Sequence, residues 1–395
     1  MHRKYSSRQT LEGAMSNTGR WIAGFRSGVV SPYEQIKLAV SREFTDQTVR
    51  QVLHLAGGGE QLRVRLSNRY GQAPLTIGAA RVALRKAGAG IVAETDAPLR
   101  FSGAEQVTVP TGAEMISDPV ELDVTAGDDL VLSLYLPGPT GLATFLHEAG
   151  ENSYVAPGNV TGDAELPGAE EVSERFFVSG VDVLAADDIP VAVAFGDSWF
   201  GGVGTSVGAN RRSIDVLNAR LDRGWAVNQG IAGNRLLRAE IGESALDRFD
   251  RDVLATPGVG RVLINFGIND LIIGDMADPV QPPATAAELI AGFTELARRA
   301  HAAGLPIHAA TIGPYAGCVY EGMSVAKSLA ARREVNEWLR TTDIFDGVFD
   351  VAAAVEDPER PDYIRPEFDC GDGMHLNDAG AAAMAETIDI AALFG

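Results

Sequence analysis

Three residues in the second half of the chain have side chains that together could carry out nucleophilic catalysis. Ser198 lies in the segment Gly196-Asp197-Ser198, and Asp372 precedes His375 by three residues. A serine hydroxyl becomes an effective nucleophile when a neighbouring imidazole accepts its proton. The imidazole needs a hydrogen-bonded carboxylate to fix its tautomer and stabilise its charged form, and a carboxylate three residues earlier can share its loop. These residue types predict attack on an ester carbonyl, followed by hydrolysis of an acyl-enzyme.

The strands predicted around these residues would bring the motifs to the same edge of a sheet. Residues 191–195 are a short apolar run that ends in glycine, which indicates a buried parallel strand rather than a helix. Residues 226–230 and 261–266 predict two more strands, followed by Gly230-Ile-Ala-Gly233-Asn234 and Gly267-Ile-Asn269-Asp270. Parallel strands bring their carboxyl ends to one edge of the sheet, so motifs far apart in the sequence can converge there.

These motifs resemble the blocks of the SGNH, or GDSL, family of serine esterases and acylhydrolases, over roughly residues 190 to 395. That family holds a Ser, a Gly, an Asn and a His in this order on a flavodoxin-like sheet. The resemblance implies that Ser198 is the nucleophile, His375 the general base and Asp372 the carboxylate that orients it. It also implies an oxyanion hole made by the backbone N–H groups of Ser198 and Gly233 and the side-chain amide of Asn269.

The sequence departs from the family at Trp199-Phe200, where members often have Ile or Leu followed by Thr. This departure leaves the shape of the acyl pocket open, and we take Asp197, Trp199, Phe200 and Asn234 as candidate pocket residues. The chemistry requires neither a metal nor an organic cofactor. The other histidines are scattered and none forms a ligand pair at i, i+4, so we expect no metal site.

Two other interpretations remain. Gly204-Thr-Ser206-Val-Gly208 matches the G-x-S-x-G pattern of α/β-hydrolases, but that serine should directly follow its strand, and a glycine-containing loop intervenes here. A different class is a glycan-binding protein with an inactive hydrolase domain. The presence of Ser198, Asp372 and His375 argues against it.

The first half of the chain has a different pattern. Short β-like runs, such as residues 61–66 and 129–136, alternate with turn residues and without long helical patterns, while residues 148–171 resemble a loop. Such a pattern predicts an all-β, jelly-roll-like sandwich. We therefore expect a disordered tail at 1–15, a β-sandwich at 16–186 and, after a polar linker, a flavodoxin-like α/β/α domain at 187–395.

Composition limits the partners. The formal net charge of −20 argues against nucleic acids and anionic membranes, which need basic surfaces. No apolar run approaches the length of a membrane span, and the N-terminus lacks the apolar core of a secretory signal. We expect a cytoplasmic protein, or a secreted one if a signal was removed. The oligomeric state stays open.

The sequence constrains the substrate less than it constrains the catalytic residues. In the family that the motifs resemble, appended β-domains often accompany esterases of acylated carbohydrates, which implies short acyl groups, such as acetyl, on carbohydrate or small alcohols. The alternative is a short-chain esterase or thioesterase of small metabolites.

Cys318 and Cys370 both belong to the expected catalytic edge and could form a disulfide there. The lack of a secretion signal favours two unlinked thiols.

Overall fold

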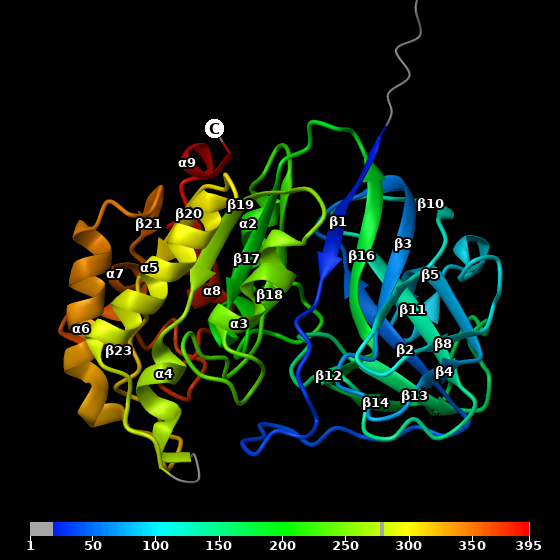
Figure 1. Ribbon diagram of the computed structural model, residues 1–395, viewed down its shortest axis with the longest axis horizontal. Helices are drawn as coiled ribbons and strands as arrows, with labels where there is room; N and C mark the ends of the chain where they lie inside the picture. Colours follow the sequence, from blue (N-terminus) through cyan, green and yellow to red (C-terminus); the bar gives the residue numbers. More distant parts are fainter. Residues whose placement is uncertain (1–18, 277–279, 395) are drawn as a thin grey trace, which may run out of the picture.

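The computed structural model describes residues 19–276 and 280–394. The predicted tail at residues 1–15 lies outside these ranges. Figure 1 shows two parts side by side, a β-sandwich coloured from blue to green and an α/β part coloured from green to red. The chain passes from one to the other through residues 186–190, in the region of the expected linker. The domain boundaries themselves stay a prediction.

The β-sandwich consists of antiparallel strands in two main sheets. The order in the first sheet is β1 (Arg20–Arg26), β16 (Val178–Ala185), β3 (Gly59–Ser67) and β10 (Val120–Val124), and β9 (Glu114–Ile116) also pairs with β3. The order in the second is β14 (Glu170–Val172), β13 (Ser153–Pro157), β2 (Gln47–His54), β11 (Asp129–Leu136), β5 (Ala79–Ala87) and β6 (Gly90–Ile91), with β7 (Ala97–Pro98) beside β5. Small pairs are β4 (Leu75–Ile77) with β8 (Val107–Val109) and β12 (Phe145–Leu146) with β15 (Arg175–Phe176), and a 3₁₀ turn η1 spans Ala93–Thr95.

The alternation in the sequence explains which face each strand buries. In β3, Leu62, Val64 and Leu66 are buried in the core, whereas Arg63 and Arg65 point away from it and pair with the buried carboxylate of Asp182. The predicted all-β sandwich is therefore confirmed. The expected loop at residues 148–171 is wrong in part, because it contains β13, which pairs with both β2 and β14. Those pairings are non-local, and the segment itself carries little alternation.

The second part is built on a parallel sheet. Its order is β18 (Trp225–Gly230), β17 (Val191–Gly196), β19 (Val259–Asn265), β20 (Ile307–Ala310) and β21 (Gly347–Phe349). Numbered along the chain, the strand order of this sheet is 2-1-3-4-5, which is the flavodoxin-like order. In such a sheet a crevice forms where the strand order reverses, which here is between β17 and β19. A small antiparallel pair, β22 (Glu356–Asp357) and β23 (Arg360–Ile364), lies outside the sheet.

Helices cover both faces of this sheet. They are α1 (Ser198–Gly201), α2 (Ser213–Ala219), α3 (Ala245–Phe249), the π-helical turn η2 (Asp250–Leu254), α4 (Ile268–Ile272), the 3₁₀ turn η3 (Ile273–Met276), α5 (Ala286–Ala302), α6 (Val325–Thr341), α7 (Val351–Val355), α8 (Asp378–Glu386) and α9 (Ile390–Phe394). Helix α2 contacts α8, and α5 contacts α3 and α6. Helix α5 begins at a capping box that Thr285 and Glu288 form. In the described part of the chain, no helix has the length and apolar character needed to cross a bilayer.

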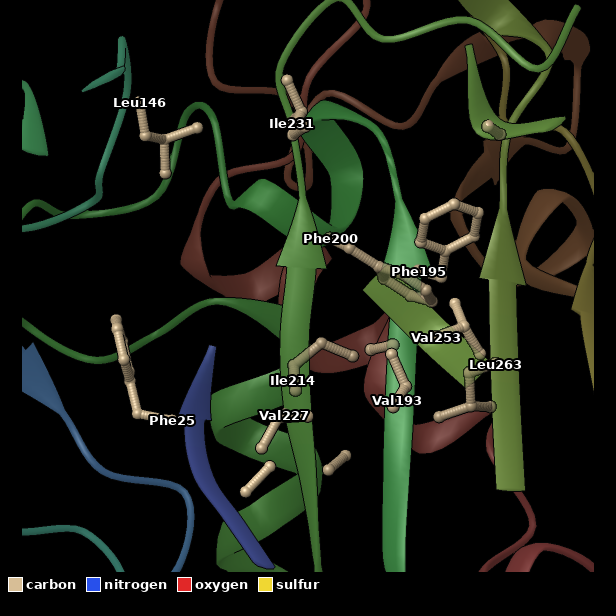
Figure 2. Packing of buried hydrophobic residues seen from close by; sticks show 14 of the residues in the cluster. Phe25, Leu146, Val193, Phe195, Phe200, Ile214, Val227, Ile231, Val253 and Leu263 are labelled. Atoms are coloured by element: carbon tan, nitrogen blue, oxygen red, sulfur yellow. The ribbon is translucent and has the colours of Figure 1, made fainter. Parts of the chain in front are cut away.

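The two parts share one hydrophobic core. Figure 2 labels Phe25 and Leu146 of the β-sandwich and Ile214 and Ile231 of the α/β part, and all four belong to one buried cluster. The indole Nε1 of Trp225 on β18 donates a hydrogen bond of 2.6 Å to the carbonyl of Ala23 in β1. The β-sandwich therefore packs on the edge strand of the parallel sheet, next to the crevice.

Candidate active site

Ser198 stands at the carboxyl end of β17, as the sequence predicts. The chain leaves the strand at Gly196, and the carboxylate of Asp197 caps α1 by accepting a hydrogen bond of 3.1 Å from the backbone N–H of Trp199. This turn holds Ser198 as the first residue of α1, with only 2% of its surface exposed. Its Oγ lies 2.9 Å from Nε2 of His375, a residue 177 positions later in the chain.

Asp372 completes a continuous chain of hydrogen bonds. Its Oδ2 lies 2.6 Å from Nδ1 of His375, and its Oδ1 accepts hydrogen bonds from the backbone N–H groups of Met374 and His375 at 2.9 and 2.8 Å. Burial alone would raise the pKa of Asp372, but the hydrogen bond and charge of His375 and these backbone donors hold it well below its usual range. The carboxylate is therefore ionised wherever His375 could act as a base.

Gly233 and Asn269 lie at the same edge as Ser198. Gly233 has a φ of +75°, and a Cβ atom there would lie 2.8 Å from side-chain carbons of both Leu38 and Ile241, so only glycine fits. The side-chain Nδ2 of Asn269 donates a hydrogen bond of 3.0 Å to the carbonyl of Asn234. The same Nδ2 also donates a longer hydrogen bond of 3.5 Å to Oδ2 of Asp197, so both contacts fix the amide at the edge of the cavity.

These residues line one cavity of about 340 Å³. Ser198, Gly233, Asn269 and His375 form its reactive end, and apolar side chains form much of the remaining wall: Leu38, Val203, Ile273, Met276, Met323 and Met374. Its acidic residues are Glu148 and Glu321, and no lysine or arginine is among the described residues that line it. Leu38 and Glu148 come from the β-sandwich, so both parts of the chain form the cavity.

The four candidate pocket residues do not line this cavity, which corrects the sequence-based expectation. The indole Nε1 of Trp199 donates a hydrogen bond of 3.0 Å to the carbonyl of Met374, and its ring covers Gly313. Phe200 lies in the buried cluster of Figure 2. Successive residues of a helix point in directions about 100° apart, so the two side chains that follow Ser198 turn away from the serine and into the core.

Asn234 and Asp197, the two polar candidates, lie outside the cavity and make hydrogen bonds that hold the adjoining loops. Asn234 is fully buried, and its Nδ2 donates to the carbonyls of Ile241 and Glu243 at 3.0 and 2.9 Å. Burial raises the pKa of Asp197 to about 7. Asp270, which follows Asn269, accepts hydrogen bonds from the backbone N–H groups of Leu236 and Leu237, and burial raises its pKa to about 6. These carboxyls fix loops and do not face the cavity.

The competing serine lies elsewhere. The Oγ of Ser206 donates a hydrogen bond of 2.8 Å to Asp378 at the start of α8, and its backbone N–H donates to the same carboxylate at 2.7 Å. His375 directs its Nε2 to Ser198 instead. The structure therefore does not bring Ser206 to the histidine.

The disulfide considered from the sequence is not formed. Cys318 and Cys370 are both free thiols, and the Sγ of Cys318 lies 3.5 Å from the sulfur of Met374. The side-chain ligand atoms of Asp369, Cys370 and Asp372 lie within 4.8 Å of one another, a spacing that could hold a metal ion. Asp372, however, is already engaged by His375 and by backbone donors, so this group is not a free ligand set.

Three residues at the site were not predicted from the sequence. The hydroxyl of Tyr320 donates a hydrogen bond of 3.0 Å to Oδ2 of Asp372, and Leu38 and Glu148 reach the cavity from the β-sandwich. None of them belongs to a motif with the expected spacing. The packing of the two parts brings Leu38 and Glu148 to the cavity, and the fold of the α/β part brings Tyr320 to Asp372.

Residues 194–383 match the GDSL-like Lipase/Acylhydrolase family. Among solved structures, a GDSL-like lipase from Bacteroides thetaiotaomicron is 16% identical, with 51% of this chain and 87% of that chain covered and a TM-score of 0.38. Est24, a carbohydrate acetylesterase from Sinorhizobium meliloti, is 15% identical, with 50% and 94% covered and a TM-score of 0.40.

A family two carbohydrate esterase from Cellvibrio japonicus is similar over 95% of this chain and 94% of its own, at 12% identity and a TM-score of 0.36. No protein with curated annotation matches the sequence. The family match spans β17 to α8 and includes the serine, the histidine and the aspartate described above. Residues 194–383 therefore form a GDSL-like lipase/acylhydrolase domain, and a β-sandwich precedes it in the chain.

Proposed function

We propose that this protein is a serine esterase that hydrolyses carboxylic esters through an acyl-enzyme intermediate. The observation that carries the proposal is the unbroken chain of hydrogen bonds from Asp372 through His375 to Ser198, which ends in the cavity. A serine in this arrangement can lose its proton to the imidazole as its oxygen attacks a carbonyl carbon. The match of residues 194–383 to the GDSL-like Lipase/Acylhydrolase family supports acyl hydrolysis as the reaction.

Each step has an assigned group. Ser198 Oγ bonds to the ester carbon while Nε2 of His375 accepts the hydroxyl proton, and the carbonyl oxygen becomes negatively charged. The N–H groups of Ser198 and Gly233 and the side-chain amide of Asn269 stabilise that oxyanion. His375 then returns the proton to the departing alcohol. Water repeats the sequence on the acyl-enzyme and releases the acid.

For the substrate, we propose short acyl groups, such as acetyl, on carbohydrate or small alcohols. A cavity of about 340 Å³ suits a small ester, and the carboxylates of Glu148 and Glu321 can accept hydrogen bonds from hydroxyl groups near the ester. A second candidate is a short-chain esterase or thioesterase of small metabolites. It is favoured by the apolar wall around Ile273, Met276 and Met323, which suits an acyl chain longer than acetyl.

The assignment of the nucleophile is testable with two serine variants. Ser198→Ala should lower kcat for p-nitrophenyl acetate by several orders of magnitude, as loss of the nucleophile does in other serine hydrolases. Ser206→Ala is the matched control and should stay within about tenfold of the wild type, a change of about 1.4 kcal/mol in the barrier. A fluorophosphonate probe, located by peptide mapping, should label Ser198. Label on Ser206, with Ser198→Ala still active, would overturn the assignment.

A panel of acetylated sugars beside p-nitrophenyl esters of increasing chain length tests the substrate. Faster hydrolysis of the acetylated sugars than of the p-nitrophenyl esters supports carbohydrate deacetylation. A rate that rises with chain length supports the second candidate. A wild-type protein that hydrolyses none of these esters and takes no fluorophosphonate label would support the glycan-binding alternative.

A further inference from the structure

Glu148 is a carboxylate in the cavity that none of the catalytic steps above uses. It lies in the loop between β12 and β13 and lines the same cavity as Ser198 and His375. Among the residues that the structure describes, its side chain has neither a hydrogen-bond partner nor an ion-pair partner. The side chain is exposed, so water solvates the carboxylate in the free protein and a bound ligand can replace that water.

The backbone on both sides of Glu148 is anchored, so its position relative to Ser198 is fixed. Nε2 of the buried His147 lies 3.1 Å from the carbonyl of Ala232, the residue before Gly233. Burial lowers the pKa of His147 to about 4, so this ring is neutral near pH 7 and above. On the other side, the N–H of Ala149 donates a hydrogen bond of 3.1 Å to the carbonyl of Ser173.

The Glu148 side chain is exposed at the catalytic cavity and also borders a neighbouring cavity with Arg26, Arg175 and Arg212. Partial desolvation raises its pKa, the charge of His375 lowers it and the charge of Asp372 raises it. Glu321 lines the catalytic cavity, whereas no described lysine or arginine does. A positively charged substrate group would compensate these carboxylates, and a negatively charged one would be repelled.

We propose that Glu148 is a specificity-determining residue that favours esters of cationic alcohols over neutral ones and disfavours esters of anionic alcohols. This inference rests on the proposed esterase function and names the charge class of its substrates. It also assigns a task to the β-sandwich, which supplies the selecting residue to an active site carried by the other half of the chain.

The test uses acetates of three small primary alcohols that differ in charge: choline, 3,3-dimethyl-1-butanol and 4-hydroxybutanoate. The assays are run at pH 8, where proton release reports hydrolysis of each ester. The wild type should show the highest kcat/KM for the cationic ester and the lowest for the anionic one. Glu148→Gln keeps the shape of the side chain and should reduce the ratio between these two by about tenfold, because it removes one unit charge near the bound alcohol.

Glu60→Gln is the matched control. Glu60 is exposed on β3 and does not line the cavity, so this variant has the same change in net charge without the local effect. Its ratio should equal that of the wild type. The role of Glu148 would be overturned if Glu148→Gln left the ratio of kcat/KM for the cationic and anionic esters unchanged. It would also be overturned if Glu60→Gln changed this ratio equally.

Binding to Ser198→Ala, measured by calorimetry with the same three acetates, keeps this test independent of turnover. A Kd that is lowest for the cationic acetate, with the order abolished by adding Glu148→Gln, supports the inference even if no acetate is hydrolysed. In that case only the esterase proposal would fail. Equal Kd values for the three acetates would refute the charge preference.

Discussion

At the scale of single residues, the hydrogen bond from Tyr320 to Asp372 makes this tyrosine a positioning residue. Burial and the neighbouring carboxylate raise the pKa of Tyr320 to about 12, so its hydroxyl remains a donor. Asp372 keeps two backbone donors and His375 when the hydroxyl is removed.

Tyr320→Phe should therefore lower kcat by less than about tenfold, the value of one hydrogen bond. The ring that lines the cavity remains, so KM should stay unchanged. Steady-state kinetics on p-nitrophenyl acetate separates the two constants. A change in KM with constant kcat would mean that the ring binds substrate and the hydroxyl has no positioning role.

A second prediction at this scale concerns the pH dependence of stability. The pKa of Asp197 is about 7 in the folded protein, and an aspartate in an unfolded chain titrates near 4. Between these values the folded state retains a proton that the unfolded state releases. The contribution of Asp197 to the free energy of unfolding is therefore fully present below about pH 4 and is lost as the pH rises toward 7.

Asp197→Asn removes this titration and keeps an oxygen that can accept the hydrogen bond from Trp199. The difference in the free energy of unfolding between pH 5 and pH 8 should become smaller than in the wild type. Urea unfolding at the two pH values measures it. Asp270, with a pKa of about 6, still contributes the same trend in both proteins. An unchanged difference would show that Asp197 is not protonated in the folded state at pH 5.

At the scale of elements, local patterns predicted the parallel sheet well because its strands are buried on both faces. The expected strands at 191–195, 226–230 and 261–266 correspond to β17, β18 and β19 within a few residues. Continuous apolar runs followed by glycine are a strong local signal. The pair β22 and β23 was not predicted, because these strands are short and β23 contains a proline.

The site residues also divide into those with a local sequence signal and those without one. Ser198, Asp372 and His375 were identified from motifs whose spacing reflects their shared chemistry. Trp199 and Phe200 were placed in the pocket only because they follow the serine, and the direction of a side chain after a helical turn is not visible in a motif. Glu148 and Leu38 belong to loops of the other domain, and their distance from Ser198 depends on how the two parts pack.

At the scale of the whole molecule, the packing between the two parts determines whether the cavity is complete. Gly57, next to β3, lies against Trp225 on β18, and a Cβ atom there would lie 2.0 Å from the indole ring. The same indole donates its hydrogen bond to β1. Because both parts belong to one buried cluster, we expect the whole chain to unfold in a single transition.

Gly57→Ala tests this interface without deleting either part. The added methyl group must displace Trp225, and overpacking of this kind costs about 1–3 kcal/mol. We expect one calorimetric transition at a lower Tm, together with a lower kcat/KM, because Leu38 and Glu148 reach the cavity across the same interface. Gly138→Ala is the control, since a Cβ atom there has no neighbour within 4 Å, and its Tm should remain that of the wild type. Two separate transitions in Gly57→Ala, with only one of them shifted, would show instead that the β-sandwich and the hydrolase domain unfold independently.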